Sequence, residues 1–204
     1  MFGLKVHKLR TPINDEDIAS IAIGDVLFLD GVVITARDLV HRLVVKEGRN
    51  CPIDLNGLAI FHAGPIVKRH DNKWFIVSIG PTTSYRMEPY EYEFIERTRV
   101  KLIIGKGFMG DRTAKACRDF KAIVTLYPGG CGAITSFNIE EVLGVYWLEL
   151  GIPEALWVLK VKELGPLIVT IDSKGNNLRN QIMDTINEQK KKIIKEIYSS
   201  IANL

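Results

Sequence analysis

The feature that most constrains this fold is an alternation of short apolar runs and helical segments in the second half of the chain. Parallel strands need long crossover connections, which are usually helices, so the alternation predicts a mostly parallel sheet covered by helices. The expected elements are strand Val100 to Ile104, helix Thr113 to Phe120, strand Ala122 to Leu126, helix Ile139 to Leu150 closed by Gly151, and strands Ala155 to Val161 and Leu167 to Ile171.

The first half favours a hairpin rather than crossovers. Val26 to Leu29 and Val32 to Thr35 are β-rich runs joined by Asp30-Gly31, a strong hairpin signal. Leu58 to His62 and Trp74 to Ile79 each lead into a Gly-Pro pair, where we expect the strand to stop. Helices are expected over Asn14 to Ile21, Arg37 to Lys46 and Tyr90 to Arg97. Together the two halves predict a layered α/β domain with two kinds of sheet.

The chain after Asn180 has the pattern of one amphipathic helix. Its apolar stripe comprises Ile182, Ile186, Ile193, Ile197 and Ile201, opposite a lysine-rich side. We expect this helix to pack on its own domain, and the alternative is a contact with a partner subunit. The expected organisation is therefore one domain over residues 1–178 and a C-terminal helix over residues 179–204.

Composition excludes several classes of protein. The 204 residues are 47% hydrophobic and 25% charged, which is typical of one globular core. A net charge of +3 is too small to indicate binding to nucleic acid or to a membrane surface. No apolar stretch approaches the roughly 20 residues of a membrane span, and Met1 to Arg10 lacks the apolar core of a secretory signal. Three widely spaced cysteines form neither a disulfide framework nor a CxxC metal motif, so a reducing cytoplasm is expected.

Two segments place polar side chains where a strand or turn leads into a helix, a common location for ligands in α/β proteins. In the first, Arg37 could clamp a carboxylate, although the residues alone slightly favour an ordinary surface arginine. His41, one turn later, favours a packed structural histidine over a proton shuttle. In the second, Thr82, Thr83 and Arg86 combine hydroxyls with a guanidinium. They suit a small anion, or the hydroxyls only cap a helix.

Two glycine-rich turns complete the candidate segments. Gly105 to Gly110 matches the GxGxxG dinucleotide fingerprint, but the next strand ends in Tyr127-Pro128-Gly129 rather than in the acid that binds ribose. Lys106, between two glycines at the end of a strand, suits a small anionic substrate, with a solvated lysine as the alternative. In the second turn, Cys131 has no paired ligand at metal spacing, and we expect a packed small residue there.

Taken in order, these segments resemble the C-terminal region of class I fumarases, which in two-subunit versions is a separate β chain shared with L(+)-tartrate dehydratase. The resemblance covers about residues 9 to 178. The motifs that carry it are Gly24-Asp25, Thr35-Ala36-Arg37-Asp38 with His41, Gly64-Pro65, Gly80-Pro81-Thr82-Thr83 with Arg86-Met87, Gly105-Lys106-Gly107, Gly129-Gly130, and Gly151 with Glu154-Ala155.

The resemblance implies a three-layer β/β/α swivelling-type domain that closes over a 4Fe-4S cluster held by a separate α subunit, in an α2β2 assembly. No metal is then expected on this chain. By resemblance, the catalytic residues are Thr82, as the candidate base, and Lys106, and the substrate-binding residues are Arg37, Thr83 and Arg86. The implied reaction is the reversible hydration of fumarate to malate by the two subunits together.

Independent chemical reasoning agrees with those residue types. Adding water to a dicarboxylate requires cations that hold both carboxylates and stabilise the charge that builds on one of them, which suits Arg37, Arg86 and Lys106. Three alternatives stay open. They are the β subunit of L(+)-tartrate dehydratase, a dinucleotide-binding oxidoreductase domain, and a non-catalytic subunit with a vestigial pocket.

Overall fold

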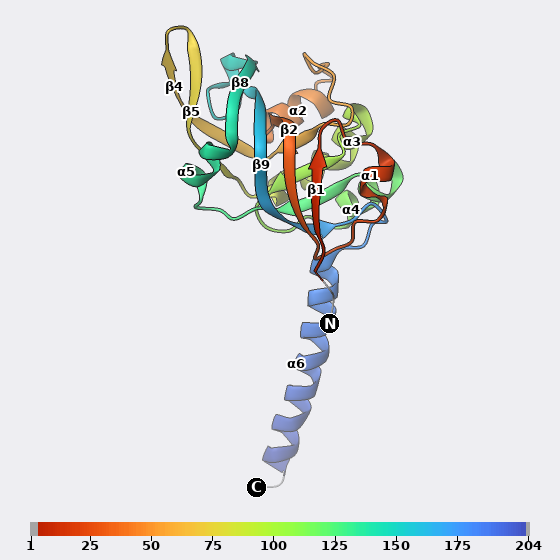
Figure 1. The fold of residues 1–204 in the computed structure, drawn as a ribbon. Coiled ribbons are helices and arrows are strands. Elements are labelled where there is room, and N and C mark those ends of the chain that lie inside the picture. The colour runs from red at the N-terminus through yellow and green to blue at the C-terminus, as the bar shows by residue number, and fades with distance from the viewer. Residues whose placement is uncertain (1–3, 203–204) are drawn as a thin grey trace.

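A computed structural model describes residues 4–202 (Figure 1). The strands are β1 (Val6–Arg10), β2 (Val26–Thr35), β3 (Ala59–Phe61), β4 (Ala63–His70), β5 (Lys73–Pro81), β6 (Leu102–Gly105), β7 (Ile123–Leu126), β8 (Ile139–Tyr146) and β9 (Leu156–Ile171). The α-helices are α1 (Asp15–Ala19), α2 (Asp38–Val45), α3 (Glu88–Thr98), α4 (Asp111–Phe120), α5 (Gly132–Thr135) and α6 (Leu178–Ala202). Short 3-10 helices cover Ser84–Arg86, Ser136–Asn138 and Leu148–Leu150.

The main sheet is mixed and closes on itself. Its order is β1-β2-β3-β6-β7-β9-β8, and β2 also pairs with β9, so that β2, β3, β6, β7 and β9 form a barrel. The pairs from β1 to β7 are parallel, whereas β9 runs antiparallel to β2, β7 and β8. The expected α/β class is therefore confirmed, but the sheet is only partly parallel, because the long final strand crosses back along the barrel.

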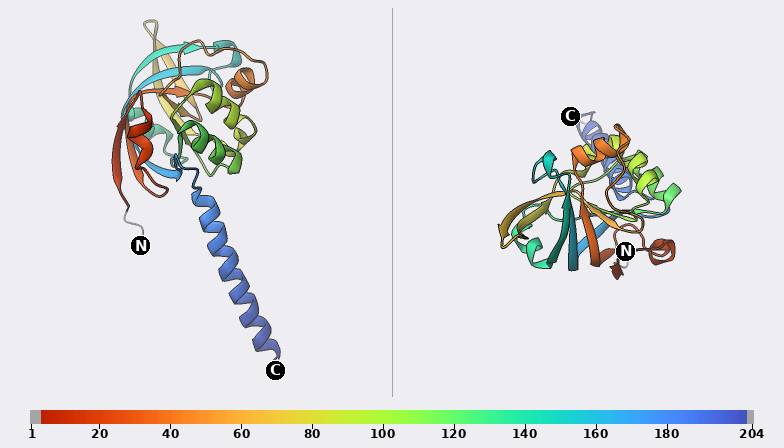
Figure 2. Two further views of the ribbon diagram at one scale, coloured as in Figure 1. Left: turned by 90° about the vertical axis from the view of Figure 1, so that its right-hand side faces the viewer. Right: turned by 90° about the horizontal axis from the view of Figure 1, so that it is seen from above.

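Two hydrophobic cores lie on opposite faces of the barrel wall. Successive side chains of a strand point to opposite faces, and β6 illustrates this, because Leu102 and Ile104 face the core inside the barrel while Ile103 faces the helices. Helices α2, α3 and α4 cover that outer face (Figure 2). Their apolar sides supply Val40, Phe94 and other fully buried residues. The predicted helices at these three positions are confirmed.

Strands β4 and β5 form a separate two-stranded sheet that packs on the barrel. Trp74 of β5 meets Trp157 of β9 edge to face, with ring centroids 5.4 Å apart. The prediction that a strand stops at Gly80-Pro81 is confirmed, because β5 ends at Pro81. The same prediction is wrong for Gly64-Pro65, because β3 already ends at Phe61 and the pair lies within β4, where Gly64 is the register partner of Gly80. Proline is tolerated here because a two-stranded sheet has only edge strands, whose outer N–H groups need no partner.

Two further predictions are wrong for tertiary reasons. Asp30-Gly31 forms no hairpin, since β2 runs continuously through it and bends there, with shifts of its register against β9. Gly31 has a φ of +103°. Residues 139–150 form strand β8 and a 3-10 helix instead of one helix. Residues 139–146 pair with β9 along their length, and these backbone hydrogen bonds stabilise them as a strand.

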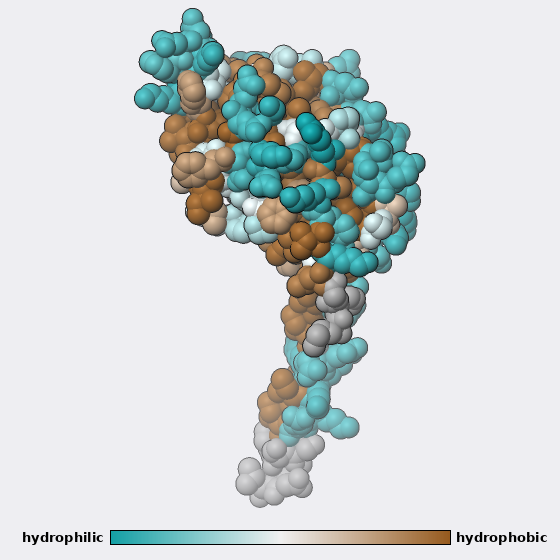
Figure 3. Space-filling model, in the orientation of Figure 1, coloured by the Kyte–Doolittle hydropathy of each residue, from teal (hydrophilic) through white to brown (hydrophobic). Residues whose placement is uncertain are grey.

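Helix α6 extends away from the body (Figures 1 and 2). Its apolar residues lie along one side (Figure 3), and Ile193 and Ile197 are each 53% exposed. The helix itself is confirmed, but the expectation that it packs on its own domain is wrong, and Ile201 lies where side chains are not described. Among residues 4–202, no helix combines the length and the apolar character that crossing a bilayer would require.

Candidate active site

The strand ends that carry the predicted residues meet through a short ladder of backbone hydrogen bonds. The N–H of Thr82 donates to the carbonyl of His62 at 2.6 Å, and the N–H of Lys106 donates to the carbonyl of Thr82 at 3.1 Å. The N–H of Ser84 then donates to the carbonyl of Lys106 at 2.9 Å. Thr83 is the bridge partner of Lys106 in this ladder. Segments 24 residues apart in sequence therefore lie side by side at the carboxyl ends of β5 and β6.

Arg86 connects this ladder to the start of α2. Its Nη2 donates to Thr82 Oγ1 at 2.8 Å and lies 3.0 Å from Asp38 Oδ2. A guanidinium that donates to a hydroxyl oxygen stabilises negative charge on that oxygen. Asp38 was not among the site residues predicted from the sequence, so its pairing with Arg86 is a new element of the site.

Arg37 caps the same helix and is held from a distant loop. Its Nε lies 3.0 Å from Glu154 Oε1, and the other carboxylate oxygen of Glu154 accepts the N–H of Leu39 at 3.2 Å. Nη1 also approaches the carbonyl of Pro153 at 3.5 Å. Glu154 thus satisfies a free N–H of the first turn and orients the guanidinium at once. A Cβ on Gly64 would lie 2.8 Å from Nη1, which explains the glycine there.

Lys106 is exposed, and its stem lies over the glycine-rich turn before α5. A Cβ on Gly129 would lie 2.8 Å from Lys106 Cδ, so only glycine lets the lysine lie in this position. Within residues 4–202, no acid forms an ion pair with its ammonium group. Cys131, which follows in this turn, is partly exposed. The segments that contain Arg37, Thr82, Lys106 and Cys131 therefore lie close together at the carboxyl ends of β5 and β6.

The glycine-rich turn is not built for a dinucleotide. The carboxylate of Glu88 accepts the N–H of Gly110 at 2.7 Å, the N–H of Thr113 at 3.2 Å and the hydroxyl of Thr113 at 2.7 Å. A dinucleotide pyrophosphate binds such N–H groups at a helix N-terminus. Here a resident carboxylate uses them and would also repel a phosphate, so the alternative of a dinucleotide-binding oxidoreductase loses its structural basis.

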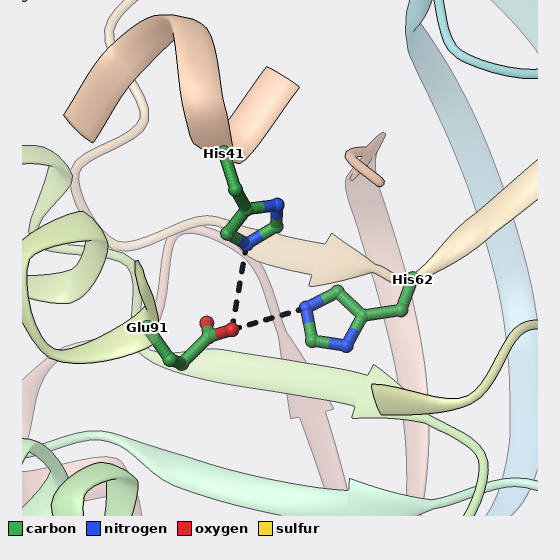
Figure 4. Close-up of side chains that lie close together, drawn as sticks. All are labelled: His41, His62 and Glu91. Atoms are coloured by element: carbon green, nitrogen blue, oxygen red, sulfur yellow. Dashed lines mark ion pairs between the residues drawn. The ribbon is translucent and has the colours of Figure 1, made fainter. Parts of the chain in front are cut away.

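His41, His62 and Glu91 form a buried charged cluster (Figure 4), and the backbone carbonyl of His62 also belongs to the ladder. The Nε2 atoms of His41 and His62 each lie 3.4 Å from Glu91 Oε2, and all three side chains are fully buried. Burial alone would raise the pKa of Glu91, but the two imidazoles outweigh it and lower the pKa to about 2. Burial lowers the pKa of His62 in spite of the nearby carboxylate.

The sequence favoured a structural role for His41, whereas nothing in it indicated a role for His62 or Glu91. His62 ends a predicted strand and Glu91 lies in a predicted helix, 29 positions apart, and neither belongs to a spacing motif. Only the packing of α2, α3 and the end of β3 brings the three side chains together. No local sequence signal could have identified the cluster.

The cysteines of this chain do not fit an iron–sulfur cluster. Burial raises the pKa of the Cys51 thiol to about 11 and that of the Cys117 thiol well above its ordinary value. Among the described residues, the only set of three or more potential ligands close enough to share a metal ion is His41, His62 and Glu91. It contains no cysteine.

Comparison with known proteins agrees with this architecture. The family model of the fumarase C-terminus matches residues 4–182. The chain is 51% identical to the L(+)-tartrate dehydratase subunit beta of Escherichia coli K12, across 93% of this chain and 94% of that protein. It is 40% identical to a provisionally named L(+)-tartrate dehydratase subunit beta of Methanocaldococcus jannaschii, across 89% and 95%.

A third relative is much longer. The chain is 35% identical to a provisionally named class I fumarate hydratase of Geobacillus stearothermophilus, across 96% of this chain but only 38% of that protein. In that relative the homologous region is thus one part of a larger polypeptide. The family match over most of the residues and the identities over nearly whole chains lead to one conclusion: this protein belongs to the fumarase C-terminal family.

Proposed function

We propose that this chain is the β subunit of a hydro-lyase that adds water to, or removes it from, a small dicarboxylate. The observation that carries the proposal is the convergence of three cations and one hydroxyl from three separate segments on the carboxyl-end face of the barrel. They are Arg37, Arg86, Lys106 and Thr82. Two carboxylates need cations to hold them, and the carbon that loses a proton needs charge stabilised beside it.

In this proposal, Thr82 first loses its hydroxyl proton to solvent, and the resulting alkoxide at Oγ1 takes the proton next to one substrate carboxylate. A threonine hydroxyl is a weak base, but Arg86 already donates to this oxygen at 2.8 Å and would stabilise the alkoxide. Lys106, whose ammonium group pairs with no acid in the described part of the chain, binds a substrate carboxylate and stabilises the charge that develops on it. Arg37, oriented by Glu154, and Thr83 contact the substrate from the sides.

The remaining chemistry is assigned to a partner. The departing or arriving hydroxyl would be stabilised by a Lewis-acidic iron of a 4Fe-4S cluster held by the α subunit. In support, the cysteines within residues 4–202 do not belong to any close set of three potential metal ligands. We propose an α2β2 assembly in the cytoplasm. In it, residues 1–178 would move as a β/β/α swivelling domain over the cluster, and residues 179–204 would form a separate helix.

Two substrates are candidates. Fumarate was preferred at first, although no residue in the sequence decides between it and tartrate. The relatives named for L(+)-tartrate are more similar to this chain, at 51% and 40% identity, than the relative named for fumarate, at 35%. Both are four-carbon dicarboxylates that the same three cations suit. The activity assay must therefore offer both substrates.

The test is anaerobic reconstitution with the matching cluster-loaded α chain, followed by measurement of fumarate loss and of tartrate dehydration. Lys106→Ala and Thr82→Ala are each expected to lower the activity at least about 100-fold, while Lys68→Ala, an exposed lysine on β4, leaves it unchanged. Activity that survives both changes would favour the alternative of a non-catalytic subunit. A wild-type complex that acts on neither substrate would overturn the proposed reaction.

A further inference from the structure

We infer that His41, Glu91 and His62 form a positioning brace that holds Arg37, Thr82 and Lys106 in their mutual arrangement. The inference deepens the proposed function and rests on it. None of the three side chains is exposed, so none can contact substrate. His41 comes from α2, Glu91 comes from α3 and His62 directly follows β3, and the three side chains point toward one another (Figure 4).

His41 holds the start of α2. Its Nδ1 lies 2.9 Å from the carbonyl oxygen of Arg37, which can only accept, so Nδ1 carries a proton. The backbone N–H of His41 donates to the same carbonyl at 3.1 Å. The opposite nitrogen, Nε2, faces the Glu91 carboxylate. A lone pair there would be repelled by the carboxylate, so we assign a second proton to His41 and a positive charge to its ring.

His62 holds the ladder. Its carbonyl accepts the N–H of Thr82, and its Nδ1 lies 3.0 Å from Ser84 Oγ. The other ring nitrogen faces Glu91, where an N–H is favourable. His62 is then neutral, with a proton on Nε2 and an Nδ1 that accepts the Ser84 hydroxyl proton. Ser84 also donates its N–H to the carbonyl of Lys106. His62 therefore holds both sides of the ladder, the Thr82 side through its carbonyl and the Lys106 side through its ring.

The packing leaves little freedom for other arrangements. A Cβ on Gly105 would lie 1.7 Å from Ser84 Oγ and 3.1 Å from His62 Nδ1. The ring of Phe94 lies 4.2 Å from the ring of His41, centroid to centroid. A buried ion pair is seldom better for stability than apolar packing of the same volume, but it fixes orientation, because any other arrangement leaves a charge unpaired. That property suits a support for catalytic groups.

The brace predicts a connected network. It runs from the Arg37 carbonyl through His41, Glu91 and His62 to Ser84, and from Ser84 to Lys106. Loss of any link should therefore misplace the catalytic groups without removing any of them. Changes at two links should not have additive effects, because either change already breaks the connection.

The decisive experiment uses the reconstituted two-chain enzyme and the variants Ser84→Ala, Glu91→Gln and the double variant. Misplacement of catalytic groups is expected to lower kcat about 10- to 100-fold in each single variant with a smaller change in KM. The double variant should be hardly worse than Glu91→Gln. Thr98→Val is the matched control, because it removes a buried hydroxyl at the end of α3 that donates to the carbonyl of Phe94 rather than to the brace.

Ser84→Ala keeps the inference falsifiable even if Glu91→Gln fails to fold, because it changes no charge. Unchanged kcat in a folded Ser84→Ala enzyme, or strictly additive effects, would overturn the brace. Nitrogen-15 NMR of histidine in the full chain gives a readout that needs no activity, so it separates failure of the brace from failure of the proposed reaction. Two protonated nitrogens on His41 and an Nε2–H tautomer of His62 are expected.

The same three groups also match a two-histidine, one-carboxylate metal set. Elemental analysis of the purified full chain distinguishes the two arrangements. The brace requires no metal at the cluster. One equivalent of zinc or iron in the wild-type chain, lost on Glu91→Gln, would replace the proton-linked brace with a metal site.

Discussion

The two ends of the barrel differ in how their side chains are partnered. At the carboxyl ends of β5 and β6, Thr82 and Arg86 bond one another above a buried ion pair. At the opposite end, where β9 finishes beside the start of β2, α6 leaves the body and exposes a row of isoleucines. At one end the polar side chains are hydrogen-bonded or ion-paired. At the other end the apolar side chains of α6 are exposed in the described part of the chain. Fixed polar contacts are therefore concentrated at the end of the barrel where the proposed chemistry lies.

The largest effect is expected from Gly105→Ala, which would break the ordered end. The new methyl group would overlap Ser84 Oγ and press on His62, so the loop must shift. We expect the activity to fall about 100-fold and the free energy of unfolding to fall by about 1–3 kcal/mol, measured by steady-state assay and urea denaturation. Gly144→Ala is the control, because its Cβ would make only an ordinary 3.7 Å contact. Equal effects at both glycines would refute the tight approach.

A smaller effect is expected from Glu154→Ala, which frees the Arg37 side chain. The variant loses the ion pair and the acceptor of the Leu39 N–H. KM should rise about tenfold, which corresponds to about 1.4 kcal/mol of binding free energy, with kcat less affected. Glu149→Ala removes an exposed partner of Arg49 and should leave KM unchanged. A fall in kcat at constant KM would show that Arg37 does not act in binding.

Asp25 tests the opposite end, where a change should affect stability alone. Burial by itself would raise the pKa of Asp25, but hydrogen bonds from the N–H of Ala22, from His7 and from the N–H of Lys5 outweigh it and lower the pKa. A lowered folded pKa means that the carboxylate stabilises the fold above its ordinary value of 3.8, and that this stability is lost as the pH falls further. Asp25→Asn should cost about 1–2 kcal/mol at pH 7.

Denaturation across a pH series checks this sign. The difference between wild type and Asp25→Asn should shrink as the pH drops below 3.8, while the activity at pH 7 stays unchanged in both. Asp71→Asn, at an exposed turn, should show no difference at any pH. A difference that grows toward acid pH would contradict the assigned direction of the pKa.

The smallest effect is expected from removal of α6 after Gln181. The shortened chain keeps the bond from Asn180 to Asp111, which joins the helix start to the body. Because the rest of the helix extends from the body, the free energy of unfolding of the body should change by less than about 0.5 kcal/mol. Thermal denaturation measures this. A large loss of stability would show that the expected boundary near residue 178 is misplaced.

Local patterns predicted the elements that their own residues determine. The apolar faces of α2, α3 and α4 and the short buried strands β3, β6 and β7 were all recognised. The resemblance also selected Thr82 and Lys106, whose segments the structure brings into one ladder. These elements share a property, since each buries a pattern that is complete within about a dozen residues.

The failures share the opposite property. Residues 139–150 carry apolar positions compatible with either period, and only pairing with β9 selects a strand. Asp30-Gly31 has a hairpin signature, yet β1 pairs with β2 up to Asp30, and β9 continues past Gly31 and holds β2 extended. His62 and Glu91 become recognisable as part of the site only through their mutual ion pair. Features that depend on contacts with a distant strand or side chain cannot be predicted from the local sequence.

The ladder of backbone hydrogen bonds has a consequence for the history of this site. Because the N–H groups of Thr82, Ser84 and Lys106 are already engaged with main-chain carbonyls, they take no part in telling one substrate from another. Discrimination therefore falls to side chains, which single nucleotide changes can replace while the main chain stays in place. A scaffold of this kind lets a lineage move between related diacids in a few steps, without rebuilding the fold beneath them.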